Sequence, residues 1–244
     1  MRIAIISDIH SNLPALEAVL ENLKSRSIDK YYCLGDIIGY AAQPKECLKI
    51  MREIVDETVF GNHEYAILYP EHIRTFNSSA REGIEYSRKS LGDDDMEWLR
   101  TLQPHMILPP LTISHGSLRD FEEYVVDATI ARLSLEMQKT NLLVIGHTHY
   151  PEGYIYDVET RTARSMDLFV EGEVILESGK RYLLNAGSVG QPRDGDPRAC
   201  YCIFDTATFK FELIRVEYDI DKAANTIIEA HLPEMLARRL YAGR

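Results

Sequence analysis

The chain has 244 residues, of which 45% are hydrophobic and 27% are charged, and its net charge is −11. This length and composition predict one globular domain, residues 1–244, with a core large enough to be stable without disulfide bonds. The acidic balance argues against extended nucleic-acid binding, which depends on basic stripes, and no run of Lys or Arg exceeds two residues.

No apolar run approaches the ~20 residues needed to span a bilayer. The apolar start of the chain is also too short for a signal peptide, so we expect a cytoplasmic protein without membrane contact. The four cysteines show no metal or redox spacing, and we expect them to be buried, reduced thiols: Cys33, Cys47, Cys200 and Cys202.

The first part of the chain alternates strands and helices. Apolar periodicity predicts strands at 3–6, 31–34 and 57–60 and helices at 13–24 and 44–54. This order, with parallel pairing, is typical of an α/β layered fold.

Each of these strands runs directly into a polar motif. The motifs are Asp8-Ile9-His10, Gly35-Asp36 and Gly61-Asn62-His63-Glu64. Because ligand sites in α/β sheets form outside the carboxyl ends of the strands, we expect the three motifs to meet at one edge.

Residues 70–104 are polar and form a helical excursion from the domain, with helices predicted at 76–91 and 94–102. This segment could be a wall over the site or the surface of a homo-oligomer, and the sequence leaves both open. The acidic tract 92–95 is expected to be a solvated turn and helix start rather than a metal site.

Strands predicted at 111–114 and 142–145 run into His115-Gly116 and Gly146-His147-Thr148-His149. Beyond Pro151 the pattern predicts mainly antiparallel strands and then two terminal helices. We therefore expect two packed sheets with helices on their outer faces.

The five motifs contain five of the eight histidines, together with carboxylates and an amide. Borderline and hard divalent cations accept these ligand types. Asp36 stands alone in its motif and is the candidate for a carboxylate that bridges two ions. Asp8 and His10, like His147 and His149, lie two residues apart, so each pair could chelate one ion or divide between two.

Together with residues 185–193, these motifs resemble those of calcineurin-like metallophosphoesterases, in particular their small bacterial and archaeal phosphodiesterase branch. The resemblance extends from residue 3 to about residue 205. It implies a four-layer α-β-β-α sandwich of two mixed sheets with outer helices.

The resemblance also implies a dinuclear metal centre. Asp8, His10, Asp36 and His149 would hold the first ion, and Asp36, Asn62, His115 and His147 the second. His63 would stay unligated beside the phosphate as a catalytic residue. The ligand chemistry suits Mn, Fe, Ni, Co or Zn, with Mn favoured in assay, and a hydroxide bridging the ions would attack phosphorus.

The favoured function is a phosphodiesterase acting on a small phosphodiester or nucleotide. A phosphomonoesterase or dinucleoside polyphosphate hydrolase is the alternative, and a non-catalytic, metal-bound scaffold is a third reading. Ser/Thr phosphatases of this superfamily carry an Asp-Arg pair where this chain has Gly39-Tyr40, which weighs against a phosphoprotein substrate.

Four residues are candidates for contacting the substrate: Asn12, Gly187, Ser188 and Arg193. Asn12 could equally be a helix cap, and Gly187-Ser188 a plain turn. For Arg193, as for Arg198, a surface turn with self-paired charges is the favoured reading. Glu64 could hold or tune His63, although neighbouring side chains often point apart.

Overall fold

The computed structural model describes residues 1–166 and 172–244, and in them it contains two six-stranded sheets. The first sheet has the order β3-β2-β1-β11-β12-β9, formed by Glu57–Thr58, Lys30–Cys33, Arg2–Ile6, Ala199–Asp205, Lys210–Val216 and Glu173–Ile175. The second has the order β4-β5-β6-β10-β7-β8, formed by His105–Leu108, Leu111–Ser114, Leu142–Ile145, Lys180–Asn185, Gly153–Asp157 and Thr162–Met166.

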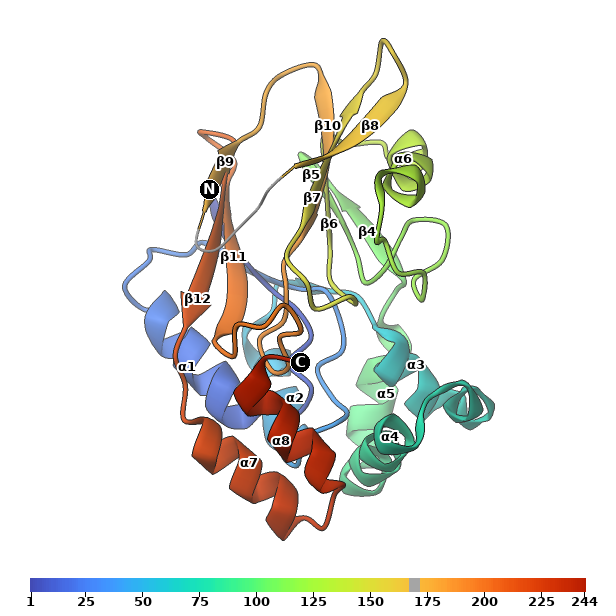
Figure 1. Cartoon of the computed structure of the whole chain (residues 1–244), viewed down its shortest axis with the longest axis vertical. Helices are drawn as coiled ribbons and strands as arrows, with labels where there is room; N and C mark the ends of the chain where they lie inside the picture. The colour runs from blue at the N-terminus through green and yellow to red at the C-terminus, as the bar shows by residue number, and fades with distance from the viewer. Residues whose placement is uncertain (167–171) are drawn as a thin grey trace.

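Both sheets are mixed. Strand β1 pairs in parallel with β2 and antiparallel with β11, while β10 pairs in parallel with β6 and antiparallel with β7. The carboxyl ends of the parallel strands in both sheets lead into the polar motifs, which places the motifs together between the sheets and the helices (Figure 1).

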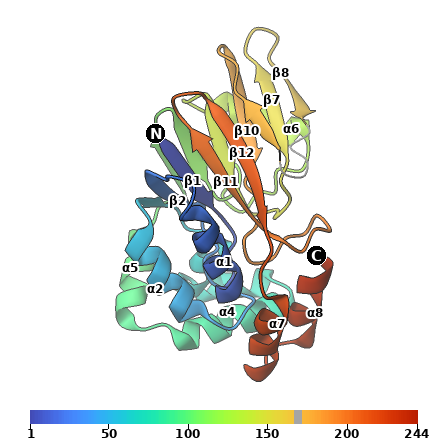
Figure 2. The same cartoon turned by 90° about the vertical axis from the view of Figure 1, so that its left-hand side faces the viewer.

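Helices lie outside the two sheets, some on the outer faces and others at one end of the molecule (Figures 1 and 2). Those of the first half are α1 (Leu13–Leu23), α2 (Pro44–Ile54), α3 (Asn62–Leu68), the 3-10 helix η1 (Pro70–Thr75), α4 (Ser78–Ser90) and α5 (Asp93–Thr101). The remaining ones are α6 (Ala128–Met137), α7 (Ile220–Glu229) and α8 (Glu234–Ala242). Figure 2 shows α1 and α2 beside the first sheet, and Figure 1 shows α6 beside the second.

Strand β1 shows how the layers form. Its side chains alternate, so that Ile3 and Ile5 are buried between the two sheets, whereas Ala4 and Ile6 pack toward the helices. On the far side, Leu135 of α6 packs on the second sheet. The predicted four-layer α-β-β-α sandwich of two mixed sheets is confirmed.

The structure contains three elements that were not predicted from the sequence, namely helix α3 and strands β4 and β8. Helix α3 begins at Asn62, inside a motif for which no helix was predicted, because Gly61 is its N-cap and the Glu64 carboxylate accepts the Gly61 N–H at 2.8 Å. Strands β4 and β8 lie at the edges of the second sheet, where part of each strand is solvent-exposed; β4 has only four residues, and β8 contains few apolar ones.

The excursion at 70–104 contains η1, α4 and α5. The acidic tract at its end is the start of α5, where the Asp95 carboxylate accepts the Gly92 N–H at 3.0 Å, as predicted. All four cysteines are free and buried, as expected, and burial raises the pKa of the Cys33 and Cys200 thiols to about 12.

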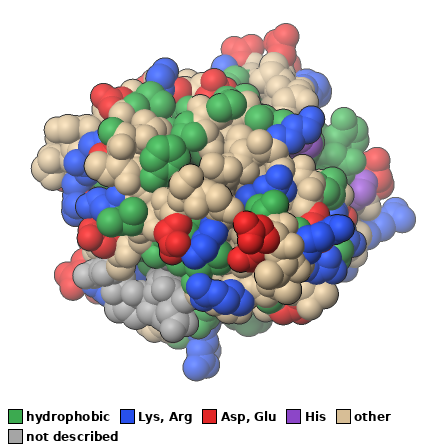
Figure 3. All heavy atoms as spheres, turned by 90° about the horizontal axis from the view of Figure 1, so that it is seen from above, with side chains coloured by type: hydrophobic (Ala, Val, Ile, Leu, Met, Phe, Trp, Pro, Cys, Tyr) green, Lys and Arg blue, Asp and Glu red, His purple; other side chains and the backbone are tan. Residues whose placement is uncertain are grey.

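Within the described ranges, the longest apolar helices fall short of a membrane span. On the face drawn in Figure 3, positive and negative side chains are interspersed rather than gathered into one basic stripe.

Candidate metal centre

The five sequence motifs converge at the carboxyl ends of strands from both sheets. Asp8 follows β1, Asp36 follows β2, and His115 and His147 follow β5 and β6; all four side chains are buried. Backbone hydrogen bonds lock these loops together, with Asp8 N donating to Gly35 O at 3.1 Å and Gly146 N to His115 O at 2.9 Å.

One group of ligand atoms comes from Asp8, His10, Asp36 and His149, and these atoms lie within 4.8 Å of one another. His149 Nε2 is 3.1 Å from Asp8 Oδ1, and His10 Nε2 is 3.6 Å from Asp36 Oδ2. The chemistry of this group is two imidazoles and two carboxylates, a set that divalent cations accept.

The second group comes from Asp36, His115 and His147. His115 Nε2 lies 3.3 Å from Asp36 Oδ2 and 3.1 Å from Asn62 Oδ1, which adds the amide oxygen of the third motif. Asp36 therefore belongs to both groups.

The histidine rings are oriented by backbone carbonyls. His10, His115 and His149 donate Nδ1–H to Ile38 O, Leu34 O and Gln191 O at 3.1, 2.8 and 2.6 Å. His147 is reversed and donates Nε2–H to Glu122 O at 3.0 Å. In a neutral ring, fixing one nitrogen as a donor leaves the other as a lone pair directed at the centre, the usual arrangement around ligating histidines.

Several of these atoms lack a partner of their own. His10 Nε2 and His149 Nε2 lie 3.0 Å apart, although each is an acceptor in the tautomer that its carbonyl fixes. Asp8 Oδ1 and His147 Nδ1 are buried without a hydrogen-bond partner among the described residues. Two nitrogens bound to one ion at ~2.1 Å and at right angles would lie ~3 Å apart, so these residues fit a divalent cation.

The backbone at the centre is unusual. Five of the seven expected ligands have positive φ, between 50° and 68°: Asp8, His10, Asp36, His147 and His149. Residues other than glycine rarely adopt this left-handed region, and such residues concentrate at functional sites.

Burial and charge set the protonation of the centre. Burial keeps the pKa of His10 and His149 below the usual value and lowers that of His147 to about 3, so these rings are neutral at pH 7. Burial also opposes the charged form of His115, but the Asp36 carboxylate raises its pKa to about 9.

His63 lies beside both groups. Its Nε2 is 4.0 Å from Asp36 Oδ2, its Nδ1 is buried without a hydrogen-bond partner in the described chain, and burial lowers its pKa to about 4. The ring packs against His10 and Tyr40, with centroid distances of 4.7 and 4.6 Å. Gly39, at φ 97°, leaves no room for a side chain, because a Cβ there would lie 2.0 Å from His63 Nδ1.

Glu64 organises the loop of Asp36, and in the described chain its carboxylate makes no hydrogen bond to the His63 ring. The carboxylate accepts the N–H groups of Asp36, Ile38 and Gly61 at 2.8, 3.2 and 2.8 Å. These contacts give Glu64 a structural role across two motifs, and an effect of Glu64 on His63 stays a prediction.

Three of the four expected substrate contacts are occupied by internal hydrogen bonds. The Asn12 carbonyl caps α1 at Ala15 N, 3.2 Å, and its amide donates to Gly190 O at 2.8 Å. Ser188 Oγ donates to Asp8 O at 2.8 Å, and Gly187 N donates to the Asn185 side chain at 2.8 Å. These residues support the ligand loops from behind.

The two arginines of the closing turn differ. Arg198 binds Asp196, with Nη2 to Oδ2 at 2.7 Å, as the self-paired turn predicted. Arg193 has no carboxylate partner among the described residues: its Nη2 reaches Gln191 Oε1 at 3.1 Å and the Tyr40 hydroxyl at 3.4 Å.

A cavity of about 320 Å³ opens over the second group. It is lined by Tyr40, Asn62, Thr75, Phe76, Asn77, Glu122, Tyr124 and His147. Tyr124 stacks on the His147 ring at 4.2 Å and 18°. No motif marks Tyr124 or Glu122 in the sequence, because both lie in an irregular stretch. The 70–104 segment contributes part of the wall through Thr75, Phe76 and Asn77.

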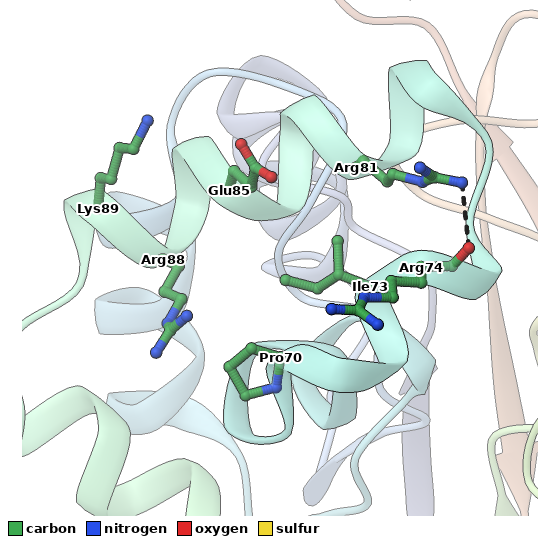
Figure 4. Close-up of a pocket in the computed structure, with 7 residues that line it drawn as sticks. All are labelled: Pro70, Ile73, Arg74, Arg81, Glu85, Arg88 and Lys89. Atoms are coloured by element: carbon green, nitrogen blue, oxygen red, sulfur yellow. Dashed lines mark hydrogen bonds between the residues drawn. The ribbon is translucent and has the colours of Figure 1, made fainter.

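A larger cavity of about 640 Å³ lies elsewhere, between η1 and α4 (Figure 4). Its lining is Pro70, Ile73, Arg74, Arg81, Glu85, Arg88 and Lys89. The Arg81 side chain there is held by the carbonyls of Phe76 and Arg74. None of the clustered Asp and His residues lines this cavity, so size alone does not locate the centre.

Comparisons with known proteins agree with this geometry. Residues 1–208 match the family described as the calcineurin-like phosphoesterase superfamily domain. An uncharacterized protein of Methanocaldococcus jannaschii is 39% identical, over 99% of this chain and 98% of that protein.

Solved structures agree as well. A metallophosphoesterase from Sphaerobacter thermophilus is 37% identical, with a TM-score of 0.89 over 100% of this chain and 99% of that one. A hypothetical protein from Pyrococcus horikoshii shares the fold at 22% identity, with a TM-score of 0.80 over 100% of this chain and 98% of that one.

Proposed function

This chain belongs to the calcineurin-like phosphoesterase superfamily, and from that premise we propose that it is a metal-dependent phosphodiesterase acting on a small phosphodiester or nucleotide. The observation that carries the proposal is the pair of ligand groups that share Asp36, with His63 beside them.

We assign the first ion to Asp8, His10, Asp36 and His149, and the second to Asp36, Asn62, His115 and His147. The unpartnered atoms Asp8 Oδ1 and His147 Nδ1 support this assignment. Two divalent ions held by these residues would supply a water of lowered pKa and positive charge for the phosphoryl oxygens. Nitrogen and oxygen ligands without thiolate suit Mn, Fe, Ni, Co or Zn, and Mn²⁺ is the ion for assay.

His63 is the proposed catalytic residue. Its Nε2 faces the shared carboxylate, so this nitrogen would meet a phosphate held at the centre. At pH 7 the ring is neutral in the absence of substrate, and a nearby phosphate anion would raise its pKa. The ring could then donate a hydrogen bond to a phosphoryl oxygen or a proton to the leaving alkoxide.

Arg193 is the one expected substrate contact that we retain. Its guanidinium lies by Tyr40, and its backbone N–H donates to His149 O at 3.2 Å, which ties it to the centre. Asn12, Gly187 and Ser188 make internal hydrogen bonds that hold the loops in place, and their contact with a substrate stays a prediction.

The size of the cavity favours a small substrate. About 320 Å³ accommodates a drug-sized or nucleotide-sized ligand. The steric conflict at Gly39 also means that this chain could not carry an acidic side chain there without moving His63. Both observations agree with the expectation that phosphoproteins are not the substrate, and the expected cytoplasmic location stays a prediction.

The test compares bis-p-nitrophenyl phosphate with p-nitrophenyl phosphate on metal-stripped protein, with and without Mn²⁺. Metal-dependent turnover that favours the diester supports the proposal. Faster cleavage of the monoester would instead support a phosphatase or a dinucleoside polyphosphate hydrolase. His63→Ala should lower kcat by about 10²–10⁴-fold without loss of bound metal. If that variant matched the parent, a non-catalytic scaffold would be the better description.

A further inference from the structure

Two arginines from distant segments meet at Tyr40. The guanidinium carbons of Arg193, in the turn after β10, and Arg239, in α8, lie 5.8 and 5.7 Å from the Tyr40 ring centroid. Helix α8 is fixed at this place because Gly195 N donates to Gly243 O at 2.9 Å and Leu240 packs in the same apolar cluster as Tyr40. Figure 1 shows the end of α8 beside the loop after β10.

Neither arginine is neutralised by a side-chain carboxylate in the part of the chain that the structure describes. Arg193 Nε is buried without a hydrogen-bond partner there. Arg239 Nε donates to a main-chain oxygen of Arg244, the last residue of the sequence, so Arg193 is the one of the two with an unsatisfied donor. The neighbouring Arg215 differs, because it pairs with Asp194.

The two positive charges also repel each other. Burial and the charge of Arg193 lower the pKa of Arg239. Two half-buried guanidinium groups in this relation favour an anion between or beside them, since a partly desolvated cation is stabilised by a charged partner.

The pair lies one aromatic ring away from the metal centre. The Tyr40 ring contacts His10 and His63, with centroids 4.6 Å apart in both cases, and lines the cavity over the second group. A molecule whose phosphate sits at the centre therefore has a second cationic position within reach past Tyr40.

We infer that Arg193 and Arg239 bind a second anionic group of the substrate, so that the preferred substrate is a phosphodiester carrying an additional, non-scissile phosphate. This inference rests on the proposed function for the scissile phosphate. A guanidinium group matches phosphate geometry in bidentate fashion, and two of them supply two positive charges, which favours a phosphate as the second group.

The test uses two matched substrates: the p-nitrophenyl ester of thymidine 5′-phosphate, and the same ester with an added 3′-phosphate. The parent protein with Mn²⁺ should prefer the phosphorylated ester by at least about tenfold in kcat/KM, mainly through KM, because hydrogen bonds between charged groups contribute this much. Arg239→Gln should abolish most of that preference, and Arg239→Lys should keep part of it.

Arg238→Gln is the matched control. Arg238 lies on the same helix, is 80% exposed and pairs with Glu234, so its loss should leave the preference intact. Retained preference in Arg239→Gln, or no preference in the parent protein, would overturn the inference.

A binding measurement separates this inference from the proposed function. Calorimetric titration of the metal-free protein with thymidine 3′,5′-bisphosphate should show affinity at least about tenfold weaker in Arg239→Gln than in the parent. If neither ester is hydrolysed but this difference is found, the proposed function fails and the anion site stands. Equal affinities of the parent and the Arg239→Gln variant for the bisphosphate would contradict the proposed anion site, whatever the ester assays show.

Discussion

His10 Nε2 and His149 Nε2 face each other at 3.0 Å, while each ring donates its Nδ1–H to a backbone carbonyl. With both rings neutral, two lone pairs meet in a buried place without a hydrogen between them. A cation or a proton must occupy the space that they share, and the metal is the simpler occupant because burial keeps both imidazoles from protonation.

Mn²⁺ should therefore stabilise the fold. At a free concentration of 100 times Kd, binding to one site adds about 2.7 kcal/mol to the free energy of unfolding. Thermal unfolding of metal-stripped protein with increasing Mn²⁺ measures the shift. The His149→Asn variant should lose much of this shift. The control variant is His105→Gln, since His105 is an exposed residue of β4, and it should keep the whole shift. Equal shifts in both variants would count against the assigned ligands.

Metal affinity should rise with pH because of His115. Its pKa of about 9 means that the metal-free ring is protonated at pH 7, and it must lose that proton to ligate. Affinity for the second ion should rise about tenfold per pH unit between about pH 7 and pH 9 and level off above.

The same residue has the opposite effect on the stability of the metal-free fold. A raised histidine pKa stabilises the fold fully below the unfolded value of 6.5 and loses that contribution as pH rises through about 9. The proton lost by His115 can be counted when metal binds. Calorimetric titration with Mn²⁺ in buffers of different ionisation heat should detect release of about one proton per protein at pH 7. Binding without proton release would contradict this account of His115.

Glu64→Ala should destabilise the fold and weaken metal binding together. The substitution leaves three buried N–H groups without their acceptor, and each such loss costs about 1–3 kcal/mol. Denaturant unfolding against Glu85→Ala, an exposed glutamate of α4, measures the difference. Unchanged metal affinity in Glu64→Ala would mean that the Asp36 loop keeps its shape by other contacts.

Gly39→Ala should reduce activity more than stability. An alanine at positive φ costs about 1–2 kcal/mol wherever it occurs, but at Gly39 its Cβ would also meet His63 Nδ1 at 2.0 Å. Gly179→Ala is the matched control, since Gly179 has φ 83° and nothing within 4 Å of the added Cβ. We expect at least a tenfold loss of kcat in the first variant only, because a misplaced catalytic group loses most of its contribution; similar kcat values in both would show that the His63 position is not critical.

The strand ends could be predicted from the sequence because their signal is local. A short apolar run followed by Asp, His or Asn marks a strand and the side chains that it delivers, and Asp8, Asp36, His115 and His147 all lie where such runs end. The layered fold follows from the same runs.

The orientation of the side chains could not be predicted, because it depends on partners distant in sequence. The carbonyls of Ile38 and Gln191 fix the tautomers of His10 and His149, and no residue pattern records a backbone carbonyl. Likewise, Arg239 reaches Tyr40 only because α8 packs against it, whereas the sequence showed nothing more than a terminal helix.

Five of the expected ligands have a left-handed backbone, which lowers the stability of the fold but holds these side chains where they can bind metal. Each such residue costs on the order of 1 kcal/mol, and a domain has only about 5–15 kcal/mol of total stability. Asp8, His10, Asp36, His147 and His149 are thus held in their conformations by the surrounding hydrogen bonds before any ion arrives. Substitution by glycine at these positions would relieve the backbone strain but remove a ligand. Selection for stability and selection for metal binding therefore act in opposite directions at these residues.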